Sequence, residues 1–205
     1  MKNMIFKRSI LPLLLCALFI SQAWATPMNR ENATKHANAG GNAAASGNWD
    51  TARKEWAQAV KNGELGNIPE QHQAIFYYEY ARAAGVTCFF DISETYLNKA
   101  YELDKKIGGP YFLSLVELFR LNLDQEKYIV AIKYFKKVLP VLEEINAPTQ
   151  SPAEFAKLLD EYSVALKSIG KNNEARKLKD RSNKIKRKAK NSITDRTPYG
   201  SSCSE

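Results

Sequence analysis

Apolar and small residues recur every three or four positions along most of this chain, a spacing that predicts helices with one buried face. The pattern is clearest within 47–59, where Ala52, Trp56 and Ala59 align on one side of a helix. Glycine and proline residues separate this stripe from those that follow. The later stripes predict helices over 71–84, from 91 or 93 to 107, over 111–123, 128–142 and 152–169, and around Ala175.

The first helix, expected over 29–46, should be weak. It is rich in alanine, but Gly40 and Gly41 lie inside it, and each glycine costs about 1 kcal/mol relative to alanine. Farther along, 146–150 is expected to form a loop. Ser151 should then cap the next helix, which has a proline in its first turn.

The second helix of each predicted pair carries a small residue at the same place. Ala52, Ser93, Ala131 and Ala175 stand at intervals of 41, 38 and 44 residues. A period in this range with two helices per unit is typical of stacked arrays, in which each hairpin buries its apolar faces against its neighbours. We therefore expect an all-α fold of four helical hairpins. An irregular helical bundle is the alternative that the same stripes allow.

The residues that carry this repeat resemble the tetratricopeptide repeat (TPR) family. The segment 159–175, LDEYSVALKSIGKNNEA, is similar to the family's first helix and turn. The resemblance implies a right-handed αα-superhelix of about four TPR-like hairpins, whose concave face, lined by the first helices, binds peptides or proteins. It does not name the ligand. The family's second-helix pattern is matched by Gly47, Trp49, Ala52, Trp56 and Ala59.

One polar pattern recurs within this frame. Glu79 and Arg82 are three apart in the second hairpin, and Glu117 and Arg120 repeat them 38 residues further on. The family geometry would stack these pairs on the concave face, in a strip that holds the backbone or a charged end of a peptide. Alternatively, they form a ladder of helix salt bridges, each worth about 0.3–0.5 kcal/mol. The predicted partner-binding residues are Tyr78, Glu79, Arg82, Glu117, Arg120, Asp160 and Glu161.

The first 25 residues have the pattern of a cleaved export signal. Lys2, Lys7 and Arg8 precede an apolar run, and Ala23 and Ala25 occupy the positions that signal peptidase recognises. We expect cleavage after Ala25 and, most simply, a bacterial periplasmic location; an uncleaved anchor is the alternative. Subtracting these three positive charges from the +8 of the whole chain leaves +5. The expected parts are a signal peptide at 1–25, a TPR-like domain at 26–190 and a polar tail at 191–205.

Positive charge is concentrated at the end of the predicted array. Within 171–190, ten Lys or Arg residues stand against two acidic residues, a local charge of +8. Because an exported protein seldom meets nucleic acid, the expected partner of such a surface is anionic lipid, cell-wall polymer or an acidic protein. A solvated capping helix is the alternative. The predicted basic surface comprises Lys184, Lys186, Arg187, Lys188 and Lys190.

Removal of the signal peptide leaves two cysteines, an even pair in an oxidising compartment. Cys88 lies in the turn after the helix expected over 71–84, and Cys203 lies in the polar tail. A bridge between them would dock the tail and stabilise the fold by about 2–4 kcal/mol. We expect this intramolecular bridge. An intermolecular bridge and two free thiols are the alternatives.

The sequence shows no pattern typical of a catalytic or metal site. His36 and His72, the two histidines, fall in no metal-binding spacing, and no nucleophile elbow or glycine-rich phosphate loop is present. We therefore expect no cofactor, no metal and no enzyme activity; a small hydrolase would need catalytic groups that are not evident. The predicted function is an exported TPR-like adaptor that binds an envelope protein or peptide in its concave groove. The alternative is an electrostatic binder of anionic polymer or lipid through the basic last helix.

Overall fold

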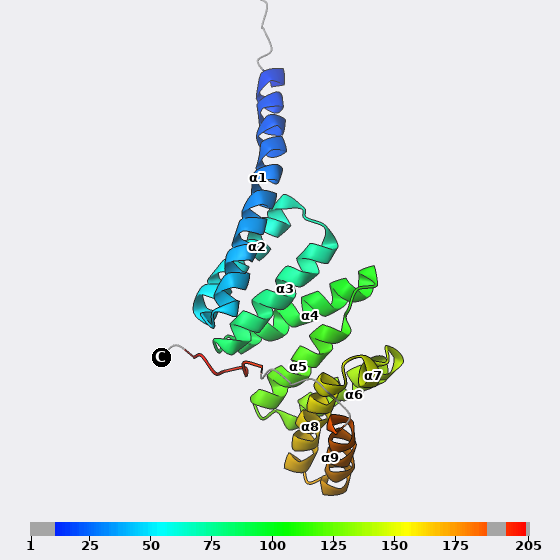
Figure 1. Cartoon of the computed structure of the whole chain (residues 1–205). Helices are drawn as coiled ribbons and strands as arrows, with labels where there is room; N and C mark the ends of the chain where they lie inside the picture. Colours follow the sequence, from blue (N-terminus) through cyan, green and yellow to red (C-terminus); the bar gives the residue numbers. More distant parts are fainter. Residues whose placement is uncertain (1–10, 188–195, 204–205) are drawn as a thin grey trace, which may run out of the picture.

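In the computed structural model, described over residues 11–187 and 196–203, all regular structure is helical (Figure 1). Side chains are described from residue 26 onward. The chain is therefore all-α in this part, as the sequence predicts. The helices are α1 (Leu11–Ala45), α2 (Trp49–Gly66), α3 (Glu70–Val86), α4 (Phe90–Ile107), α5 (Phe112–Asp124), α6 (Tyr128–Glu144), α7 (Ala147–Gln150), α8 (Pro152–Ser168) and α9 (Asn172–Lys186).

The helices pair as hairpins along the chain. α1 packs most extensively on α2, α3 on α4, α5 on α6, and α8 on α9. α2 also contacts α3, α4 contacts α5 and α6 contacts α8, so each hairpin packs against the next one. Figure 1 shows the hairpins following one another in chain order, as in a stacked helical-repeat array. The predicted four-hairpin arrangement is confirmed.

The repeating small residues lie where neighbouring helices meet. Ala52, Ser93 and Ala131 are fully buried, and Ala175 is 7% exposed. A larger side chain at any of these positions would push against the adjacent helix, because protein interiors are close-packed. The intervals in the sequence therefore mark equivalent positions in the four hairpins.

Gly40 has a packing role in the first hairpin. A Cβ atom at this position would lie 2.8 Å from the indole of Trp56, closer than real Cβ contacts allow. Trp56 itself is 6% exposed, so the space beside Gly40 allows this tryptophan of α2 to pack in the core. The glycine that weakens α1 by propensity thus allows it to pack on α2.

Two predictions at the start of the last hairpin are wrong. The segment expected to be a loop contains the four-residue helix α7, whose start is favoured by a proline in its first turn. Ser151 does occupy the N-cap position of α8, but its side chain makes no capping hydrogen bond. Its amide donates to the carbonyl of Ala147, so the same residue also ends α7.

The signal peptide stays a prediction. Residues 1–10 lie outside the described part, and α1 runs without interruption past the predicted cleavage site after Ala25. Among the residues that are described, no helix combines the length and the apolar composition that crossing a bilayer requires.

Candidate functional site

A chain of ion pairs links α3, α5 and α8, the first helices of the last three hairpins. Arg82 of α3 donates to the carboxylate of Glu117 on α5 at 2.8 Å. Arg120 donates to the same carboxylate at 3.2 Å and to Glu161 of α8 at 2.9 Å. Four of the predicted partner-binding residues are therefore brought together. We call the surface that α3, α5 and α8 build the first-helix face.

Glu117 lies at the centre of this network and is only 4% exposed. Burial alone would raise the pKa of its carboxyl group, but Arg82 and Arg120 stabilise the carboxylate and hold the pKa below its ordinary value of 4.5. Hydrogen bonds from Arg82 and Tyr199 act in the same direction. Because its partners are all within the chain, Glu117 is not available to a ligand.

The C-terminal tail, 196–203, supplies further partners to the same network. Arg196 forms a bidentate pair with Asp124 at the end of α5, with both N···O distances at 2.6 Å. Its Nε donates to Glu161 at 3.1 Å. Tyr199 is buried, and its hydroxyl donates to Glu117 at 2.8 Å. Charge-assisted hydrogen bonds of this kind are stronger than neutral ones, so the tail is held firmly on the face.

Backbone hydrogen bonds attach the tail to the last turn of α3. The amides of Gly200 and Ser202 donate to the carbonyls of Gly85 and Val86, each at 3.0 Å. The sequence predicts that this helix ends at residue 84, but α3 continues through Gly85 to Val86. A Cβ atom there would lie 2.3 Å from the ring of Tyr199, so a glycine is needed for the tail to dock. The covered half of the first-helix face comprises Arg82, Gly85, Val86, Glu117, Arg120, Asp124 and Glu161.

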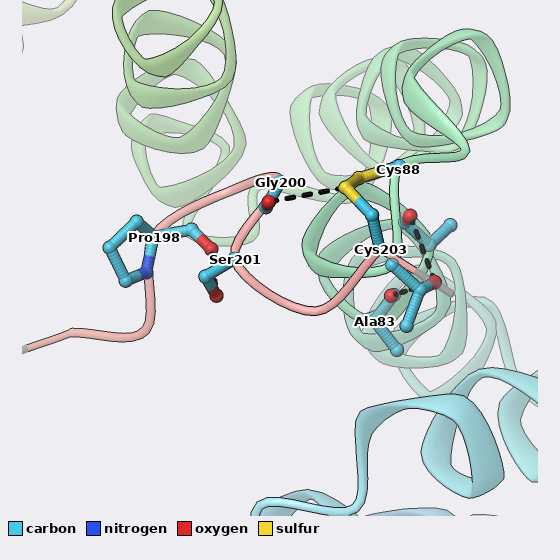
Figure 2. Close-up of a disulfide and its surroundings, with 8 residues drawn as sticks. Ala83, Cys88, Pro198, Gly200, Ser201 and Cys203 are labelled. Atoms are coloured by element: carbon cyan, nitrogen blue, oxygen red, sulfur yellow. Dashed lines mark hydrogen bonds between the residues drawn. A yellow bond between two sulfur atoms is a disulfide. The ribbon is translucent and has the colours of Figure 1, made fainter. Parts of the chain in front are cut away.

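A disulfide fixes the end of the tail. Cys88 and Cys203 are bonded, with their Cα atoms 5.3 Å apart and a sequence separation of 115 residues. Figure 2 shows the tail looping past Pro198 and Gly200 before Cys203 meets Cys88. The predicted intramolecular bridge is confirmed, and with it the return of the C-terminus to the second hairpin.

The other half of the first-helix face is hollowed by two adjoining cavities. One, of about 400 Å³, lies between α5, α8 and the α6–α7 connection. The other, of about 270 Å³, lies between α3, the end of α4 and the start of α5. Tyr78 and Leu113 line both cavities, and none of the described tail residues lines either. We call them together the open groove. Its lining includes Ile75, Tyr78, Glu79, Asp104, Leu113, Ile145 and Glu154.

Apolar side chains are exposed to solvent in the open groove. Ile75 is 52% exposed, Leu113 is 42% exposed and Ile145 is 39% exposed. Large apolar residues that gather around a concave surface are typical of binding sites for peptides and small molecules. The open groove is therefore the candidate functional site.

A larger hollow elsewhere is a weaker candidate. It has a volume of about 510 Å³ and lies between α2, α3 and α4. Two of its three carboxylates have partners, since Glu64 accepts from Tyr77 at 2.8 Å and Glu70 pairs with Lys106. None of the large apolar residues that are exposed in the described part of the chain lines this hollow.

Glu79 lines the open groove without an ion-pair partner among the described residues. Its position three residues before Arg82 suggests a pair, but Arg82 donates to Glu117 instead. The Glu79 side chain is half-buried, and burial raises the pKa of its carboxyl group above the ordinary value. Tyr78 lies beside it and packs on the core cluster that contains Tyr199.

The structure separates Asp160 from the other predicted partner-binding residues. Its carboxylate pairs with Lys179 at 3.1 Å and with Lys186, both on α9, so Asp160 joins the two helices of the last hairpin. Of the remaining predicted basic surface, Lys184 and Arg187 are exposed. Lys188 and Lys190 lie outside the described residues.

Sequence reasoning missed three residues of the covered half and the tail. Asp124 directly follows the helix predicted over 111–123, in a short polar stretch, and Arg196 and Tyr199 belong to a segment whose composition is polar. The position of Tyr199, four residues before Cys203, could have indicated that it packs on the fold. Once the bridge is predicted, an aromatic residue so close to it has a surface on which to pack.

Comparisons with known proteins do not assign a family. No protein-family model matches the sequence, and no curated protein matches it. A solved crystal structure of the MamA protein is similar to the chain, with a TM-score of 0.47 and 14% sequence identity, over 80% of this chain and 99% of that chain. The description of the fold rests on the hairpins themselves.

Proposed function

We propose that this chain is an exported, non-catalytic, TPR-like adaptor that binds a protein or peptide of the cell envelope in the open groove. The observation that carries the proposal is the exposure of Ile75, Leu113 and Ile145 around two adjoining cavities. Burying apolar surface contributes about 25 cal/mol per Å², so a partner segment that covers these side chains gains affinity from them.

The residues of the first-helix face divide into two roles. Tyr78 and Glu79 line the open groove, where a partner can reach them. The guanidinium groups and carboxylates of the covered half bind one another and the tail, and so hold the helices that form the groove. The proposed contact residues are Tyr78 and Glu79, and the proposed positioning residues are Arg82, Glu117, Arg120 and Glu161.

Export is part of the proposal. The pattern of the first 25 residues favours secretion, and a disulfide such as Cys88–Cys203 is typical of oxidising compartments, including the periplasm. Mass determination of protein recovered from the periplasmic fraction tests this. A chain that starts at Thr26 and contains no free thiol is expected, whereas a chain that starts at Met1 would contradict cleavage.

A pull-down from the native envelope tests binding in the groove. Ile75→Ser combined with Leu113→Ser removes exposed apolar side chains from the groove. Ile129→Ser combined with Val164→Ser removes similarly exposed side chains that line neither cavity. The Ile75→Ser/Leu113→Ser variant should no longer capture the partner protein, whereas the Ile129→Ser/Val164→Ser control should still capture it. Equal capture by two folded variants, as judged by circular dichroism, would contradict the proposal.

Binding of anionic polymer or lipid through α9 is the second candidate, and the exposed Lys184 and Arg187 favour it. The pairing of Lys179, Arg181 and Lys186 with carboxylates of α6 and α8 reduces the free positive charge on this helix. Co-sedimentation with phosphatidylglycerol vesicles distinguishes the two functions. Binding that falls steeply as salt rises would favour α9, because exposed charges are screened beyond about 10 Å at 0.1 M salt.

A further inference from the structure

We propose that the partner segment bound in the open groove is both apolar and basic, and that Glu79 receives one of its lysine or arginine side chains. This inference rests on the proposed function and specifies the chemistry of the partner. Four observations support it: the charges that line the groove, the environment of Glu79, the way in which the covered half holds the tail, and the distribution of charge along the chain.

The described lining of the open groove has unpaired negative charge and no unpaired positive charge. Glu79, Asp104 and Glu154 line its two cavities, and none of them has an ion-pair partner among the described residues. Glu117 and Arg120, at the border with the covered half, also line the groove; Arg120 is the one basic residue in the lining, and its guanidinium pairs with Glu117 and Glu161. An acidic partner would therefore meet like charge, and a basic partner would meet opposite charge.

Glu79 is the carboxylate with the most to gain from a partner. It is half-buried beside Tyr78, and burial of a carboxylate without a cation is unfavourable. Burial also raises the pKa of Asp104, whose half-buried side chain lines the same cavity. A cationic side chain that enters this cavity would meet two carboxylates in its lining and would offset their unfavourable burial.

The covered half shows how this face holds a segment of such chemistry. Arg196 lies between the carboxylates of Asp124 and Glu161, and the ring of Tyr199, three residues further on, is buried. A basic side chain followed by an aromatic one is therefore already bound on the same three helices, in the part of the tail that the structure describes. The open groove repeats the components of that site, namely carboxylates beside apolar side chains: Glu79 and Glu154 come from first helices and Asp104 comes from α4.

The distribution of charge along the chain also favours a basic partner in the groove. Without the predicted signal peptide the chain has a net charge of +5, and 171–190 alone contributes +8, so the remaining residues have a net charge of −3. A basic segment is therefore repelled by the last helix and attracted by the part of the chain that forms the groove. Orientation of this kind favours one binding site over non-specific contact.

Fluorescence anisotropy with three labelled peptides tests the inference on the purified, oxidised protein. The first peptide contains leucine, lysine and serine; the second has every lysine replaced by glutamate, and the third has every leucine replaced by serine. At about 150 mM salt, where the Debye length is about 8 Å, the leucine–lysine peptide should bind at least about tenfold more tightly than either of the others.

Substitution of Glu79 shows whether the binding occurs in the groove. Glu79→Gln should weaken binding of the leucine–lysine peptide about three- to tenfold, as expected for loss of a partly desolvated ion pair. Glu102→Gln is the matched control, because Glu102 is exposed on α4 and lines neither of the two cavities. It should change the affinity less than about twofold, within the range of surface substitutions.

Three outcomes would overturn the inference. They are equal or tighter binding of the glutamate peptide, no effect of Glu79→Gln, and no binding of any of the three peptides. None of these outcomes decides the proposed function, which is judged by capture of an envelope protein with the Ile75 and Leu113 variants. If the Ile75→Ser/Leu113→Ser variant no longer captured the envelope protein, and the glutamate peptide bound more tightly than the lysine peptide, the groove would bind an acidic partner rather than a basic one.

Discussion

The covered half and the open groove are built on the same three helices, but they differ in how their charges are satisfied. Under the tail, the carboxylates of Glu117, Asp124 and Glu161 each pair with a guanidinium at 3.2 Å or less. In the groove, Glu79 and Asp104 have no such partner among the described residues. The comparison indicates that the covered half is complete within the chain, whereas the groove is complete only with a partner.

The two halves should also differ in what their residues do for the fold. The tail bonds Cys88 of the second hairpin, Asp124 of the third and Glu161 of the fourth, and so ties together the hairpins whose first helices form the groove. A groove that is held in shape before binding loses less free energy to ordering when it binds. We therefore expect substitutions in the covered half to lower stability, and substitutions in the groove to lower binding.

The largest effect should come from Glu117→Ala. It leaves Arg82 and Arg120 buried without their shared carboxylate and removes the acceptor of Tyr199. Breaking a buried pair in this way costs about 3–5 kcal/mol of unfolding free energy, measured by urea denaturation.

Glu102→Ala is the control for this measurement, because it removes an exposed carboxylate from α4 and should change stability by no more than about 0.5 kcal/mol. If Glu117→Ala lowered stability no more than Glu102→Ala does, the covered half could not be the part that secures the fold.

Cys203→Ser should have the next largest effect, about 2–4 kcal/mol, because it frees the unfolded chain from a long closed loop. Cys88→Ser should produce the same loss, and the double variant should be no less stable than either single variant. Losses that add in the double variant would show that the cysteines act separately rather than through a shared bridge.

Tyr199→Phe should lower stability by a smaller amount, about 1.5–3 kcal/mol, since it deletes one hydrogen bond to a buried charged group and keeps the ring. Tyr101→Phe is the matched control in the fourth helix and should have little effect. A loss for Tyr199→Phe that equals the control would mean that the bond to Glu117 contributes nothing to docking of the tail.

Lowering the pH should change the contributions of the two halves to folding stability in opposite directions. The pKa of Glu117 in the folded chain is below its ordinary value of 4.5, so its contribution to stability is present above pH 4.5 and is lost as pH falls through the lowered pKa. The pKa of Glu79 is raised by burial, which outweighs the opposing effect of Arg82. Its charge therefore lowers stability at neutral pH, and this effect disappears as pH falls through the raised pKa.

The smallest stability effect should therefore be that of Glu79→Gln. At pH 7 the variant should match the native chain or exceed it by up to about 1 kcal/mol, and the difference should shrink as the pH is lowered toward 4.5. Urea denaturation across this range measures both trends. A Glu79→Gln variant that is clearly less stable at pH 7 would show that Glu79 has a structural partner.

Much of the fold could be predicted because it repeats. The intervals between Ala52, Ser93, Ala131 and Ala175 mark equivalent packing positions. The paired helices follow from the spacing of apolar residues and from the glycines and prolines between them, whereas the short α7 was missed. The bridge from Cys88 to Cys203 could be predicted from the count of cysteines and the expected compartment.

The candidate site could be predicted only in part, because it depends on distances between hairpins. Spacing along one helix places Glu79 beside Arg82, yet Arg82 reaches Glu117 on the next hairpin, which leaves Glu79 for the groove. The tail has no periodicity, so nothing in its sequence pattern indicates that Arg196 and Tyr199 would occupy half of the predicted binding face.

Site-specific photo-crosslinking in living cells tests most directly whether the open groove is the binding face. A photoreactive amino acid is placed at Leu113 in the groove and, separately, at Ile129, which is exposed on α6 and lines neither cavity. The account predicts one discrete crosslinked envelope protein from Leu113 and none from Ile129. The same protein crosslinked from Ile129, with none from Leu113, would contradict it.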